Sequence, residues 1–150
     1  MRGILISSRV YAVMLVLGIL ALSTVACAIP KPSETSGLED SAWILESYGK
    51  QGKLQKVLEG TEITAIFDST EGEVRGSAGC NTYFADYKIK NSKLSILQLA
   101  YTEMYCLEPE GVMEQEKQYL KALQAAESFQ VQDGKLQINS GNEILIYNAK

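Results

Sequence analysis

The sequence contains no histidine among its 150 residues. Ser-His-Asp and Cys-His nucleophilic sites are therefore excluded, and so are the commonest zinc ligand and the usual proton shuttle near neutral pH. The chain has only three cysteines and no CxxC redox motif. It also lacks a Gly-rich phosphate loop and a Gly-x-Ser-x-Gly nucleophile elbow. We therefore expect no catalytic residues, no cofactor and no bound metal, and we predict that the protein is not an enzyme.

Positive charge is in short supply. The formal net charge is -4, and residues 1–26 carry Arg2 and Arg9 but no acidic residue. Without that segment, 12 basic residues face 18 acidic ones, a net charge of -6. An acidic domain does not favour phosphate backbones, so the composition predicts no nucleic-acid partner.

The N-terminus has the layout of a secretory signal. A basic start up to Arg9 precedes the apolar run from Val10 to Leu22, and small residues lead to Cys27. Three interpretations remain open: a lipoprotein with a lipid on Cys27, ordinary cleavage at Ala26-Cys27-Ala28, or an uncleaved membrane helix over residues 10–29. Each predicts an extracytoplasmic domain, and the first and third anchor it to the membrane of the cell envelope. Residues 1–27 are thus the expected signal peptide and lipobox, and the Pro- and Ser-containing residues 28–38 a flexible linker.

The cysteine count suggests one disulfide. If Cys27 is lipidated, Cys80 and Cys106 remain as an even pair with 25 residues between them. An oxidising compartment favours a bridge between them. The alternative is that both thiols are buried and free.

Alternating apolar residues and turn signals predict a series of strands. The Asp133-Gly134 pair between two alternating runs is the strongest hairpin signal. The expected strands cover residues 41–48, 53–57, 63–67, 73–77, 82–88, 94–99, 129–132, 136–139 and 144–147.

One helix is expected within the series, over about residues 109–126, with Pro109 in its first turn. Its apolar stripe includes Met113, Leu120 and Leu123, which predicts packing against the sheet. The expected fold is therefore a single α+β domain, in which a curved, mainly antiparallel sheet of about seven or eight strands packs on one main helix.

Two short motifs carry a resemblance to a known family. The first runs from Gly76 to Tyr83 (GSAGCNTY), and the second from Thr102 to Cys106 (TEMYC). With the helix that follows, they resemble the META domain family, which includes heat-shock lipoproteins of the HslJ type. The resemblance covers about residues 39–148. It implies a compact α+β fold, export and frequent lipid anchoring, with a background in stress responses, and it implies no reaction.

The first motif can also be interpreted physically. Gly76 and Gly79 permit backbone angles that are closed to other residues, Asn81 can cap nearby backbone groups, and Tyr83 would pack from the next strand. One interpretation is a strand corner pinned by the disulfide. The other is a ligand groove that this corner lines with residues of the second motif. Those residues are Thr102, Met104 and Tyr105.

Three functions fit these features. The first is a non-catalytic binding or structural protein of the envelope, with an exposed aromatic patch near Tyr83 and Tyr87 that contacts an envelope protein. The second is an inhibitor of an envelope hydrolase that acts through a protruding loop at Asp68–Gly72. The third is an enzyme that uses carboxylates alone. The acids near the helix start predict a solvated helix face rather than a cation site. These acids are Glu103, Glu108, Glu110, Glu114 and Glu116.

Overall fold

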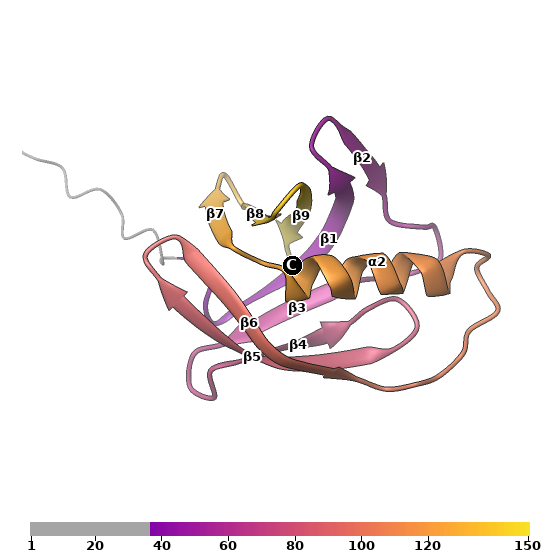
Figure 1. Cartoon of the computed structure of the whole chain (residues 1–150), viewed down its shortest axis with the longest axis horizontal. Coiled ribbons are helices and arrows are strands. Elements are labelled where there is room, and N and C mark those ends of the chain that lie inside the picture. Colours follow the sequence, from indigo (N-terminus) through magenta and orange to yellow (C-terminus); the bar gives the residue numbers. More distant parts are fainter. Residues whose placement is uncertain (1–36) are drawn as a thin grey trace, which may run out of the picture. The chain divides into compact units, whose positions relative to one another are not determined.

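The computed structural model describes residues 37–150, which form nine strands and one helix (Figure 1). The predicted signal segment, Cys27 and nearly all of the predicted linker lie outside the described residues. The elements are β1 (Ser41–Lys50), β2 (Lys53–Lys56), β3 (Thr64–Asp68), β4 (Glu73–Ser77), β5 (Thr82–Lys90), β6 (Lys93–Tyr101), α2 (Val112–Gln124), β7 (Ser128–Gln132), β8 (Lys135–Ser140) and β9 (Glu143–Ala149). Each predicted strand is present, so the expectation of a mainly antiparallel sheet with one helix is confirmed.

The sheet closes on itself, which is more specific than the curved sheet expected. Its strand order is β2-β1-β3-β4-β5-β6-β7-β8-β9, and β1 also pairs with β9. Eight strands therefore form an antiparallel barrel, with β2 as an added hairpin arm on β1. Closure covers most of the edges that an open sheet of this size would expose.

Side-chain alternation sets the inner face of the barrel. On β5, Tyr83, Ala85 and Tyr87 point inward, while the residues between them face outward. Tight turns join the strands, as at Asp133-Gly134, where both residues have positive φ. The largest fully buried side chains include Phe67, Leu94, Leu123, Leu136 and Tyr147.

The helix begins later than expected. Gly111 is its N-cap residue, with φ of 88°, so Pro109 precedes the helix instead of occupying its first turn. A left-handed residue ends the preceding loop and sets where the helical backbone can start. The apolar stripe packs inward as predicted, but Gln115 and Glu116 are buried with it.

Helix α2 lies against the least continuous part of the barrel. Strands β6 and β7 pair only at Lys93 and Ser128. Figure 1 shows α2 crossing the barrel beside β6, and its residues contact β6, β8 and β9. The helix thus covers part of the opening that β6 leaves as it diverges from β7. Within residues 37–150, no helix has the length and apolar character needed to cross a membrane.

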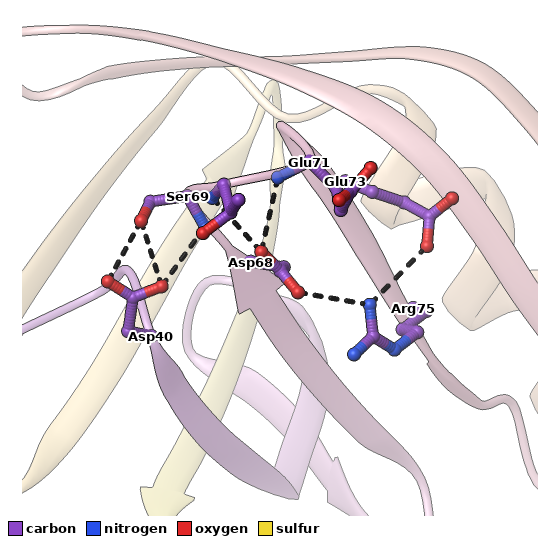
Figure 2. Close-up of polar contacts among 7 residues, drawn as sticks. Asp40, Asp68, Ser69, Glu71, Glu73 and Arg75 are labelled. Carbon is purple, nitrogen blue, oxygen red and sulfur yellow. Dashed lines mark hydrogen bonds and ion pairs between the residues drawn. The ribbon is translucent and has the colours of Figure 1, made fainter.

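The turn between β3 and β4 is held by its own polar groups (Figure 2). The Asp68 carboxylate accepts the N–H groups of Thr70 and Glu71, and Arg75 lies 3.4 Å from it. These backbone N–H donors, foremost that of Glu71, lower the pKa of Asp68. The hydroxyl of Ser69 donates to Asp40 at 2.9 Å, which ties the start of the domain to this turn. The turn expected at Asp68–Gly72 is therefore compact and cross-braced, with Ser69, Thr70 and Glu71 exposed.

Candidate functional site

The two sequence motifs meet through the side chain of Asn81. Its Oδ1 accepts hydrogen bonds of 2.7 Å from the Met104 N–H and the Thr102 hydroxyl. Its Nδ2 donates to the Met104 carbonyl at 3.1 Å. The amide thus pairs with both backbone groups of Met104, as a neighbouring strand would. This bond pattern explains why an asparagine follows the bend and why an extended Thr-x-Met segment lies beside it.

A buried carboxylate completes the same network. Glu116 Oε1 accepts from Asn81 Nδ2 at 2.6 Å, and Oε2 accepts from the backbone N–H groups of Asn81 and Cys80 at 2.6 and 3.2 Å. Glu116 is 3 % exposed and Asn81 2 % exposed. An ionised carboxylate is tolerated in such a place only when its oxygens are well hydrogen-bonded, and three N–H donors meet that need here. Glu116 therefore does not belong to the solvated helix face expected from its acidic neighbours.

A disulfide between Cys80 and Cys106 joins the two motifs covalently, with Cα atoms 5.9 Å apart. The predicted pairing is present, and the alternative of two free buried thiols does not hold. A loop of this length contributes about 3 kcal/mol to stability in the chain-entropy model. The bridge and the Asn81 network thus restrain the segment after β6 at two adjacent points.

The two glycines of the first motif serve different purposes. Gly79 has φ of 113°, as predicted for a sharp bend. Gly76 has no such backbone angle, and a Cβ at this position would lie 2.0 Å from the Thr64 carbonyl oxygen. That carbonyl accepts a hydrogen bond of 2.9 Å from the Tyr83 hydroxyl. Gly76 is thus needed because the backbones of β3 and β4 approach closely here. The sequence had instead suggested that Gly76 is needed for an unusual backbone angle.

Three buried tyrosines link the bend to the helix and to the last strand. The Tyr83 hydroxyl lies 2.8 Å from that of Tyr119, and Tyr147 donates to Tyr119 at 3.3 Å. Because Tyr83 donates to Thr64, the chain of hydroxyl donors runs from Tyr147 through Tyr119 to Tyr83. Burial raises the pKa of all three phenols. They remain neutral at physiological pH, and their arrangement fits a structural network rather than a proton relay.

The restrained segment carries an exposed apolar surface. Residues 101–107 follow the last inward-facing positions of β6. We call this segment the strap. Its large apolar side chains are 51 % exposed at Tyr101, 57 % at Met104, 78 % at Tyr105 and 77 % at Leu107. Grouped exposure of this kind is unusual for a domain that functions alone and is typical of contact surfaces.

Tyr83 and Tyr87 do not themselves contribute to an exposed patch. Tyr83 faces the barrel interior, and Tyr87 is buried with its hydroxyl on Glu39 at 2.8 Å and its ring against Phe67. Burial is the main cause that raises the pKa of Tyr87. The inward alternation of β5 therefore places both rings in the core. The aromatic side chains exposed near Tyr83 are instead those of Phe84, the next residue, and Tyr101, the partner of Tyr83 on β6.

The predicted motif residues do not line one common groove. Asn81, Thr102 and Met104 form the hydrogen-bond network described above. Gly76 and Tyr83 border a shallow groove of about 580 Å³ on β3, β4 and β5, next to Phe84. Tyr105 borders another groove, of about 460 Å³, between the strap and the start of α2. In the part of the chain that the structure describes, no group of three Asp, Glu or Cys residues could hold a metal ion.

Comparison with known proteins places this geometry in context. The family model described as the META domain matches residues 36–150. An NMR structure of a protein from Burkholderia xenovorans is 28 % identical and has a TM-score of 0.66, over 80 % of this chain and 88 % of that one. A crystal structure of a DUF4847 family protein from Bacteroides vulgatus, 10 % identical, shows similarity of fold alone, with a TM-score of 0.53 over 74 % of this chain and 93 % of that one. No curated protein matches the chain.

Proposed function

Because the chain belongs to the META domain family, we propose that it is an exported, membrane-anchored binding module of the cell envelope that contacts a protein partner through the strap. The family brings no reaction, so the proposal depends on the exposed side chains of Tyr105 and Leu107 on a restrained backbone. Tyrosine is among the usual anchors of protein interfaces, and an apolar neighbour such as Leu107 helps to exclude water around it. A backbone already fixed by a disulfide and by Asn81 loses little conformational entropy on binding.

The placement of the strap fits attachment at the other end of the domain. The described chain begins at Gly37, beside Val131, and Asp40 is bound to the β3–β4 turn. The strap continues from the end of β6, at the opposite end of the barrel (Figure 1). There the Thr102 N–H donates to the carbonyl of Thr82, the first residue of β5. The strap therefore lies at the end of the barrel opposite to the point where the described chain begins. The intact mass of the membrane-extracted protein tests the membrane anchor. A lipid on Cys27 would add its mass to that of the chain. An unmodified Cys27 would contradict this part of the proposal.

Removing the exposed apolar side chains should abolish partner binding without affecting the fold. We expect the double variant Tyr105→Ser, Leu107→Ser to lose at least about tenfold in partner affinity, because interface anchors each contribute about 1–2 kcal/mol or more. The free energy of unfolding should change by less than about 1 kcal/mol, since both side chains are already exposed. The readout is site-specific photo-crosslinking from position 104 of the full-length protein in its membrane, with and without the double variant.

A matched control separates the strap from exposed apolar residues in general. Leu54→Ser on the β2 arm also removes an exposed leucine, 41 % accessible, and should leave the crosslinks unchanged. A crosslinker at Asp133, in the β7–β8 turn, should give none of the same products. Equal crosslinking from residues 104 and 133, or crosslinks that survive the double variant, would contradict the proposal.

A further inference from the structure

The edge of β6 that faces α2 has an incomplete set of backbone partners. Thr102 donates to Thr82, so the alternation of an antiparallel ladder directs the N–H and C=O of Tyr101 away from β5. On that outer side, β7 pairs with β6 only at Lys93. The Ile96 carbonyl accepts instead from the side chain of Gln124 on α2, at 3.2 Å. From Ile96 to Tyr101, β6 thus has no strand partner on this side, and Gln98, with φ of 52°, divides this edge into two short parts.

A groove of about 470 Å³ lies beside this edge. On the β6 side it is lined by Leu99 and Tyr101, and on the α2 side by Met113 and Leu120. The nearby carboxylate of Glu116 is turned toward Asn81 and is satisfied there. The groove therefore offers apolar walls next to backbone groups that lack a strand partner.

Charge indicates what the groove accepts. Lys117 and Lys121, one helical turn apart, lie on the groove and are exposed. Neither forms an ion pair within residues 37–150, although acidic residues outnumber basic ones in the domain. Most other lysines of residues 37–150 form no ion pair either, so it is the position of these two beside one groove that favours an acidic ligand there.

We propose that the open edge of β6 binds an extended peptide segment of the partner, in which acidic residues alternate with apolar ones. The segment adds a strand to β6 and hydrogen-bonds to the backbone at Tyr101. Alternate side chains of a strand point to opposite faces, so the apolar ones enter the groove and the acidic ones face solvent at its rim. The long, exposed side chains of Lys117 and Lys121 reach them there. This inference rests on the proposed binding function and names the class of partner.

The test uses a defined peptide and the full-length protein. The probe is the capped heptapeptide Glu-Val-Glu-Leu-Glu-Val-Glu, titrated while amide NMR signals are followed. We expect shifts at Ile96, Leu99 and Tyr101, and weaker binding when salt rises from about 0.05 M to about 0.5 M. Methylating alternate backbone nitrogens of the peptide should weaken binding at least about tenfold, because it removes the ladder donors.

Charge reversal tests whether Lys117 and Lys121 contact the peptide. K117E with K121E should weaken binding of the acidic probe about tenfold or more and improve binding of a probe with lysine at every glutamate position. The matched control K88E with K90E removes the same charge from β5 and should have little effect. No shifts on β6, shifts confined to Phe84 and its neighbours, or equal binding of the methylated peptide would overturn the inference. Absence of strap crosslinks in the natural protein, with this peptide still bound, would overturn the proposed partner contact alone.

Discussion

Asn81→Asp should lower the free energy of unfolding by about 3–5 kcal/mol near neutral pH, the range expected when a buried charged network is broken. Asp matches Asn in shape, so no cavity forms. The replaced Nδ2 atom, however, donates to Glu116 at 2.6 Å and to the Met104 carbonyl. In its place, a second carboxylate oxygen would face two acceptors in a buried site. The measurement is urea unfolding of the oxidised protein.

The pH dependence of this deficit gives a second readout. Two carboxylates in contact can share one proton, so the folded variant would take up a proton that the unfolded chain does not hold. Its deficit relative to the natural protein should therefore be largest at about pH 7.5 and smaller at about pH 5. The control Asn142→Asp lies in an exposed turn and should change stability by less than about 0.5 kcal/mol. A deficit that is small, or equal at both pH values, would show that Asn81 and Glu116 are not coupled.

Gly76→Ala should cost about 3 kcal/mol or more, although alanine fits the backbone angles there. The added Cβ would lie 2.0 Å from the Thr64 oxygen and 2.7 Å from its carbonyl carbon. These are backbone atoms, so relief requires β3 and β4 to separate and the Tyr83 hydrogen bond to break. Thermal or urea unfolding of the variant measures the loss.

Gly60→Ala is the informative comparison for this variant. Gly60 has φ of 83°, which disfavours alanine, but nothing lies within 4 Å of a Cβ placed there. Its expected cost is about 1 kcal/mol. Gly76, which has ordinary backbone angles, should therefore lose more stability on substitution by alanine than Gly60. The reverse order would contradict the close approach of Thr64 to Gly76.

Local patterns in the sequence predicted the strands and turns. Alternation of Tyr83, Ala85 and Tyr87 marks β5, and Asp133-Gly134 marks the β7–β8 turn. Closure of the barrel was not predictable in this way, because the pairing of β1 with β9 joins segments about a hundred residues apart. An edge strand and a closed strand have the same alternation.

Burial of Glu116 was missed, although the sequence held a signal for it. Glu116 lies three residues after Met113 and four before Leu120, and therefore within the apolar stripe of α2. A glutamate is expected to face solvent because its side chain is charged. The three N–H donors that allow it to be buried come from a bend about 35 residues earlier in the chain. The groove beside β6 could not be predicted from the sequence either, because it exists only where α2 lies beside an unpaired strand edge.

The central claim is that Asn81 holds an exposed strap in a fixed position. Native-state amide hydrogen exchange of the full-length protein at Met104 and Tyr105 tests it most directly. The Met104 N–H donates to the buried Asn81 Oδ1 and should be protected nearly as well as amides of the barrel core. The adjacent Tyr105, whose side chain is 78 % exposed, should exchange orders of magnitude faster. Equally fast exchange at both amides would contradict the account.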